Sequence, residues 1–245
     1  MQHVVSDFQD QLVRGLSHRM NNILSLFHGY LGLLMDDVKL DAVAKEGLKK
    51  IREGARAATD LMERTNAVSR PPGSMEREVS VADFFRQLAP AFAGLHGPEI
   101  RLSVICPDEL PRVTVDPSRL RLVLTELIRN ACEAAHSKVA VRVTTNAKNL
   151  RAALASRTAP ETAEQWLKIE ITDDGAGIRA SDAKRIYEPF FSTKKKPQCA
   201  GLGLAVALGC AQQFGGSLAH RSRKGETTFE MILPIRAPHQ LGAVA

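Results

Sequence analysis

Two long stretches near the N-terminus repeat apolar residues every three or four positions. Residues 6–36 form the first stretch and residues 42–69 the second, with a short polar turn between them. This spacing predicts two amphipathic helices. In the first helix the apolar positions follow a heptad pattern, at Val13, Leu16, Met20, Ile23, Phe27, Tyr30 and Leu34. Two helices cannot bury both stripes alone, whereas two copies of the hairpin can form a four-helix bundle, so we expect a homodimer.

After this hairpin the pattern changes to alternating helices and strands. Prolines and a glycine at 70–74 end the second helix and begin a short linker. Residues 106–115 are predicted to be a loop and 146–165 a polar surface excursion. The helices are predicted at 81–92, 117–135 and 201–214, and the strands at 100–105, 139–145, 166–172, 217–223 and 227–233. The fold class is therefore α+β.

The helix at 117–135 carries two oxygen-bearing side chains against its apolar stripe. Glu126 and Asn130 are four residues apart, so they project from one face, one turn apart. A carboxylate and an amide oxygen suit a hard cation such as Mg²⁺, which prefers oxygen ligands and keeps several waters. Taken alone, the same pair is also typical of the solvated face of an ordinary helix.

Two glycine-containing runs follow strand-like or loop segments. Asp173 comes directly after a strand, and its acceptor-only carboxylate can take the amino proton of adenine and reject guanine. Gly175 and Gly177 allow the backbone to approach a base closely, although an ordinary Asp-Gly turn has the same composition. Gly201 and Gly203 open a helix, whose free amides and positive dipole end form an anion site.

In their order and spacing, these motifs resemble the ATP-binding domain of the GHKL family. The helix with Asn130 resembles the asparagine box, 173–177 the first glycine box, 187–194 the phenylalanine box and 201–205 the second glycine box. More narrowly they resemble sensor histidine kinases, over roughly residues 80–235. The resemblance implies an α/β sandwich in which helices cover a mixed sheet. It also implies ATP, contacted through adenine by Asp173, and Mg²⁺ held by Asn130 and Glu126.

The segment between Phe191 and Gly201 is short, basic and polar. In the resembled family this segment is a mobile lid over ATP, and lids of this kind gate turnover. The resemblance therefore assigns Lys194 a contact with a phosphate. Solvated surface charge is the alternative interpretation of three consecutive lysines.

The segment from Ser17 to Asn22 resembles the histidine box of these kinases. His18 is two residues from the seam position Leu16, so it points away from the seam, and the resemblance makes it the phosphoacceptor. A surface histidine is the alternative. Arg19 stands where the commonest histidine box has an acid, and it cannot accept a proton, so the segment matches the His-Arg-x-x-Asn subclass. The phenylalanine box and the run 201–205 instead resemble the commoner class, so the sequence combines features of both. Asn22 corresponds to a residue that positions a hydrolytic water in some relatives, and an ordinary surface residue is again the alternative.

The resemblance implies a dimeric histidine kinase of a two-component system. His18, Asn22 and Glu126 would be catalytic, and the partner would be the receiver domain of a response regulator, whose aspartate receives the phosphoryl group. Residues 1–70 would be the dimerisation and phosphoacceptor domain, 71–77 a linker, 78–236 the ATP-binding domain and 237–245 a flexible tail.

Glu133 departs from the family pattern, because many relatives place a lysine there, near the phosphates. No sensor domain is recognisable, so either an upstream sensory protein supplies the signal or the native chain begins earlier.

One alternative function is a phosphotransfer, phosphatase or scaffold protein with a weakly active ATP domain. Another is a serine-directed GHKL kinase, which would need no hairpin bearing a phosphoacceptor.

Composition narrows the classes further. Hydrophobic residues at 44% and charged residues at 24% are ordinary for a soluble globular protein. The net charge of +6 is dispersed and aromatic residues make up only 5%, which argues against a nucleic-acid platform. The four cysteines show neither metal nor disulfide spacing. The longest apolar run, 23–35, is too short to cross a membrane, and no signal peptide is recognisable, so we expect a cytoplasmic chain.

Overall fold

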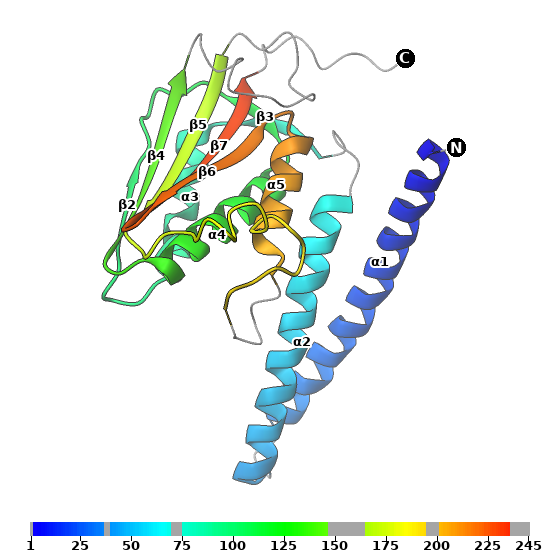
Figure 1. Ribbon diagram of the computed structural model, residues 1–245. Coiled ribbons are helices and arrows are strands. Elements are labelled where there is room, and N and C mark those ends of the chain that lie inside the picture. Colours follow the sequence, from blue (N-terminus) through cyan, green and yellow to red (C-terminus); the bar gives the residue numbers. More distant parts are fainter. Residues whose placement is uncertain (1, 37–39, 70–74, 147–164, 195–200, 236–245) are drawn as a thin grey trace. The chain divides into compact units, whose positions relative to one another are not determined.

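The computed structural model describes residues 2–36, 40–69, 75–146, 165–194 and 201–235. Most of the predicted linker, the surface excursion and the predicted tail lie outside these residues. The chain forms two compact units, one containing helices α1 and α2 and the other the remaining helices and strands (Figure 1).

The first unit is a pair of long helices, as the apolar periodicity predicts. Helix α1 spans Gln2–Met35 and α2 spans Ala42–Ser69. Leu24 and Leu31, seven residues apart on α1, are buried, and His28 Nε2 hydrogen-bonds Thr59 Oγ1 of α2 over 3.2 Å. These two leucines are not among the predicted heptad positions, which are exposed within the single chain at Leu16, Met20, Ile23, Phe27, Tyr30 and Leu34. The predicted stripe therefore lies beside the one that packs on α2.

The second unit is built on a five-stranded mixed sheet in the order β2-β4-β5-β7-β6. Strand β2 runs parallel to β4, and every other neighbouring pair is antiparallel. Helices α4 and α5 pack on each other and on this sheet, and α3 packs on α4 (Figure 1). The strands are β2 Arg101–Ile105, β4 Lys138–Asn146, β5 Gln165–Asp173, β6 Ser217–Arg223 and β7 Glu226–Ile235, and the helices are α3 Val81–Ala93, α4 Pro117–Ala134 and α5 Gly203–Gln213. The predicted α+β class with a mixed sheet covered by helices is confirmed.

A two-stranded sheet was missed by the sequence analysis. Strand β1, Arg77–Val79, pairs antiparallel with β3, Val113–Val115. The sequence predicted the end of a linker and part of a loop at these positions. Three residues are too few to display an alternation, so the signal for each strand exists only once its partner is known.

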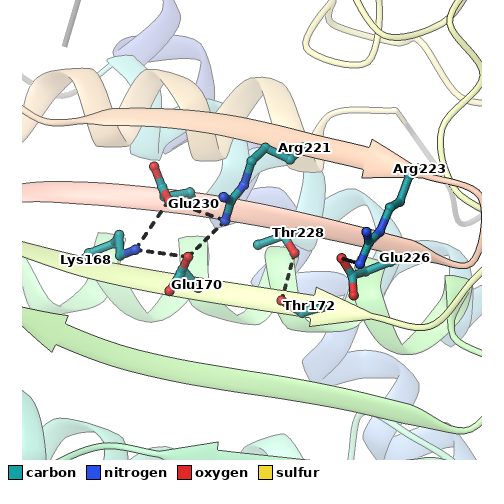
Figure 2. Close-up of polar contacts among 8 residues, drawn as sticks. All are labelled: Lys168, Glu170, Thr172, Arg221, Arg223, Glu226, Thr228 and Glu230. Carbon is teal, nitrogen blue, oxygen red and sulfur yellow. Dashed lines mark hydrogen bonds and ion pairs between the residues drawn. The ribbon is translucent and has the colours of Figure 1, made fainter. Parts of the chain in front are cut away.

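The two faces of the large sheet differ sharply in polarity. Leu167, Ile169 and Ile171 of β5 have no exposed surface and face the helices. The alternating residues Lys168 and Glu170 lie on the opposite face, where they join ion pairs (Figure 2). This period-two pattern places the core between the sheet and α4 and α5.

The helix that carries the candidate ligands begins where its sequence predicts. Asp116 caps α4, because its Oδ1 accepts hydrogen bonds from the amides of Ser118 and Arg119 at 2.8 and 3.3 Å. Pro117 occupies the first turn, where its missing N–H costs nothing. The cap fixes the start of the helix and therefore the face on which Glu126 and Asn130 lie.

Candidate functional site

The structure brings Glu126, Asn130 and Gly203 together. A Cβ atom at Gly203 would collide with Oε2 of Glu126 and would lie 3.5 Å from Nδ2 of Asn130. The first turn of α5 therefore packs directly on the polar face of α4, and a side chain at position 203 would displace the carboxylate. Glu126 is 2% exposed and forms an ion pair with Arg129, one turn along the same helix. This ion pair was not predicted from the sequence.

Gly201 holds the segment that leads into α5 against the phenylalanine-box residues. Its φ angle is +66°, and a Cβ atom there would lie 2.8 Å from the carbonyl oxygens of Phe190 and Phe191. The amide of Phe190 donates to the carbonyl oxygen of Gly201 over 2.9 Å. At the N-cap position of α5, Leu202 offers no side-chain hydrogen bond to the helix amides. These amides form the kind of helix start that binds anions.

Asp173 lies at the end of β5 with 3% of its surface exposed. The amide of Gly175 donates to its Oδ1 over 3.0 Å, and burial raises the pKa of its carboxyl. A Cβ atom at Gly175 would collide with the carbonyl oxygen of Ala134, at the C-terminal end of α4. The first glycine run therefore packs on the helix that carries Asn130.

Gly177 is fixed against the hairpin of β6 and β7. It has a φ angle of +86°, and a Cβ atom would clash with the carbonyl group of Arg223. The amide of the next residue, Ile178, donates to Ser222 Oγ over 2.8 Å. Ser222 Oγ in turn lies 3.0 Å from Oγ1 of Thr227, which is 4% exposed and pairs with Asp173 across the strands. Neither hydroxyl was singled out from the sequence, because their relation to Asp173 depends on strand register.

Asp174, the neighbour of Asp173, fixes the same turn from the other side. Its Oδ1 accepts hydrogen bonds from the amides of His136, Ser137 and Lys138 at 2.9 to 3.1 Å. Its Oδ2 accepts from Ser137 Oγ over 2.7 Å. These bonds, led by the Ser137 hydroxyl, hold the pKa of Asp174 well below its usual range. The two adjacent aspartates therefore differ in function: Asp174 ties the turn to the start of β4, whereas Asp173 faces the interior.

The phenylalanine-box segment is anchored to the sheet by an aromatic contact. The hydroxyl of Tyr187 lies 3.1 Å from Nδ1 of His220 on β6. Burial raises the pKa of Tyr187 to about 12 and lowers the pKa of His220. The guanidinium of Arg185 lies 4.3 Å from the centre of the Phe191 ring. These contacts hold the residues that precede the predicted lid.

The roles predicted for the site residues stay predictions, including those of three residues not described above. His18 and Asn22 both lie in α1, one helical turn apart, within the unit described separately from the sheet. Asn22 and its neighbour Arg19 are exposed. Lys194 adjoins residues 195–200, which lie outside the described part of the chain, so its contact with a phosphate stays a prediction.

The ligands available for a metal are few. Within the described residues, no group of three or more His, Cys, Asp or Glu side chains is placed to hold a metal ion. The side chains of Glu126 and Asn130, which carry a carboxylate and an amide, both lie beside the start of α5. This set fits Mg²⁺, which is usually held by one or two protein ligands together with waters and substrate phosphates. It does not fit a structural metal site, which would need more protein ligands.

The mixed sheet and its helices, with Asp173 buried and α5 packed closely on Glu126, form an α/β sandwich. Residues 115–237 match the family model for the histidine kinase-, DNA gyrase B-, and HSP90-like ATPase. The chain belongs to this family, whose ATPase domain implies ATP binding.

Within this family, the relatives most informative for this chain are named as kinases. The chain is 29% identical to sensor kinase CckA of Brucella abortus (strain 2308), over 91% of this chain and 24% of that protein. It is 26% identical to sporulation kinase E of Bacillus subtilis (strain 168), over 96% of this chain and 29% of the relative. A third relative is the signal transduction histidine-protein kinase AtoS of Escherichia coli (strain K12), 26% identical over 92% of this chain and 34% of the relative. The chain thus spans about a quarter to a third of the length of these relatives.

A solved structure supports the fold. Full-length ShkA in complex with AMPPNP matches with a TM-score of 0.65 and 23% identity, over 93% of this chain and 47% of that chain. In the described residues, no helix is both long and apolar enough to cross a lipid bilayer.

Proposed function

We propose that this chain is an ATP-dependent protein histidine kinase of a two-component system that autophosphorylates His18. The observation that carries the proposal is the packing of Gly203 on Glu126 and Asn130, in a domain of this ATPase family that follows a helical hairpin. The relatives named as sensor kinases and histidine kinases support the same activity.

In this proposal, side chains and backbone amides of the ATPase domain position the nucleotide. Asp173 accepts the amino proton of adenine, and the Gly175 amide keeps its carboxylate oriented. The free amides at the start of α5 bind phosphate oxygens. Glu126 and Asn130 would hold Mg²⁺, which would neutralise charge on the phosphates. Most of the catalysis in such a transfer comes from alignment and charge neutralisation.

The chemical step is phosphoryl transfer to an imidazole nitrogen of His18. The nitrogen lone pair attacks the γ-phosphorus, the bond from this phosphorus to the β,γ-bridging oxygen breaks, and ADP leaves with that oxygen. The imidazole N–H proton passes to water or to a carboxylate of the ATP-binding unit. Arg19 cannot take it, so we expect slow autophosphorylation. The phosphoryl group then passes to an aspartate in the receiver domain of a response regulator.

The test is incubation of the chain with γ-labelled ATP. His18→Gln should abolish acid-labile labelling while leaving ATP affinity intact. His28→Gln is the matched control, because it removes a histidine of the same helix and glutamine can still hydrogen-bond Thr59. Undiminished labelling of His18→Gln contradicts the assignment of the phosphoacceptor. An acid-stable label would indicate a serine-directed kinase instead.

We also propose a phosphatase role for Asn22 toward the phosphorylated regulator. Asn22 follows His18 by one helical turn and is exposed, so both residues can meet the same docked partner. Its amide can orient a water without changing charge, and the planar guanidinium of Arg19 can hold a phosphate. Decay of phosphorylated regulator should slow with Asn22→Ala and Arg19→Ala. Equal decay with the parent and Asn22→Ala removes this role and leaves the kinase alone.

A further inference from the structure

The ion pair between Glu126 and Arg129 lies where α4 meets the start of α5. Arg129 Nη2 contacts Oε2 of Glu126, and the same oxygen would collide with a side chain at Gly203. We propose that Arg129 is a positioning residue for the phosphates: it neutralises Glu126, so that an anionic polyphosphate can bind beside this carboxylate. The inference rests on the proposed function, because it assumes that phosphates bind at the start of α5.

Burial explains why Glu126 needs a cation. The Glu126 side chain is 3% exposed, whereas the Arg129 side chain is 31% exposed. Water therefore screens the carboxylate poorly, and its repulsion of a nearby polyphosphate would be strong in this setting. The guanidinium cancels that charge from the solvent-facing side and uses one of its five donors on Glu126. The remaining donors leave it able to hold an incoming phosphate oxygen.

The other arginines of α4 do not occupy this position. Arg119 is 4% exposed and lies between Asp116, at 3.6 Å, and Gln213, to which it donates a hydrogen bond of 2.8 Å. These contacts involve the first turn of α4 and the last residue of α5, at the end of α5 away from Gly203. Arg121 is exposed and serves as a control of equal charge on the same helix.

The first experiment compares nucleotides of different charge by calorimetry on the full chain. Arg129→Met should weaken Mg·ATP binding about tenfold or more and leave AMP binding within about twofold. Arg129→Lys should restore part of the loss, and Arg121→Met should bind both nucleotides as the parent does. An equal loss for AMP and ATP would mean that Arg129 only supports the fold. Unchanged ATP affinity would also overturn the inference.

The second experiment tests neutralisation directly in the presence of EDTA, so that the proposed metal-binding role of Glu126 does not interfere. Arg129→Met should weaken metal-free ATP binding, and adding Glu126→Gln should restore it, because the negative charge that Arg129 balances is then removed as well. A double variant as weak as Arg129→Met contradicts neutralisation even when the parent binds ATP well. A parent that binds neither ATP nor AMP refutes the proposed function and this inference together.

Discussion

The two units of this chain treat their apolar residues in opposite ways. In the sheet unit, Leu124 and Leu127 of α4 have no exposed surface. On α1 of the hairpin, Tyr30 is 67% exposed and Leu33 is 72% exposed. The sheet unit has a core that is closed within one chain, whereas the hairpin presents a continuous apolar face, which in soluble proteins marks an interaction surface. A second copy of the hairpin is the occupant that we propose.

The largest effect is expected from placing a charge on that apolar face. Phe27 is 52% exposed in the single chain and belongs to the predicted heptad. If the face is buried between two copies, Phe27→Asp places two desolvated carboxylates in each dimer, which should cost on the order of 5 kcal/mol. Sedimentation should then show a dimeric parent and a monomeric variant at micromolar concentration.

Ser25→Asp is the control for this change. Ser25 is exposed, and its position differs from that of Phe27 by about 200° around the helix. It adds the same charge to the same turn, and it should leave the dimer intact. A parent that sediments as a monomer would contradict the proposed dimer, because the apolar face of the hairpin would then be exposed in solution.

The next largest effect belongs to the closed core. Leu124→Ala removes a fully buried side chain between α4 and its neighbours and should lower the free energy of unfolding by about 2–5 kcal/mol. Because this core lies within one chain, the loss should not depend on protein concentration. Thermal unfolding at several concentrations checks this. A concentration-dependent loss would mean that the sheet unit also relies on a second copy.

The length and periodicity of each element explain how much of the fold could be predicted from the sequence. The second helix of the hairpin was predicted with its observed bounds, and β4, β5, β6 and α5 within a few residues, because each is long enough to show its period. The heptad of α1 was displaced by one residue from the stripe that packs on α2, since a helix with two adjacent apolar stripes has no single preferred face in its sequence. Strands β1 and β3 were missed because neither is defined without the other.

The candidate site was predictable only where a motif carries its own local geometry. Glu126 and Asn130 share a face by helical spacing, and the structure adds that Gly203 packs on both. Asp174 and Thr227 were not predicted, because their contacts join residues more than thirty positions apart through strand register. Arg129 was passed over because an arginine on an amphipathic helix ordinarily signals only a solvated face.

Asp173 is a charged residue in the otherwise apolar core of the sheet unit. We expect it to lower the stability of the fold and to contribute to ATP binding. Asp173→Asn keeps an acceptor for the Gly175 amide but places amide donors where adenine presents its amino group. Calorimetry should show ATP binding weakened by about 1–3 kcal/mol. Unchanged binding would contradict the assignment of Asp173 to adenine.

Asp173 also makes the stability of the parent depend on pH, and the direction of this dependence follows from its pKa. Burial raises the folded-state pKa of Asp173 above its unfolded value of about 3.9, so the folded state binds more protons in between. Stability therefore falls as pH rises through this window, and the penalty is fully present at neutral pH. Asparagine carries no such penalty. Asp173→Asn should thus be more stable than the parent at pH 7 without nucleotide, and this advantage should vanish near pH 3.

The smallest effect is expected on the face of the sheet opposite the helices, which is held by charge. Glu170 of β5 and Glu230 of β7 stand directly opposite each other, an arrangement that is unfavourable without cations. Lys168 Nζ lies 3.1 Å from Glu170 and 3.7 Å from Glu230, and Arg221 Nη2 lies 3.1 and 3.8 Å from them (Figure 2). Both cations therefore bridge the same two carboxylates.

The solvent exposure of the two cations predicts which one contributes more to the free energy of unfolding. The Lys168 side chain is 22% exposed, whereas that of Arg221 is 71% exposed, so water screens the arginine more strongly. Lys168→Met should lower the free energy of unfolding by about 1 kcal/mol and Arg221→Met by at most about 0.5 kcal/mol. Denaturant titrations should show both losses shrinking in about 1 M salt. Equal losses that persist in salt would mean that this face is held by packing, as the opposite face is, and that the contrast between the two faces is one of composition alone.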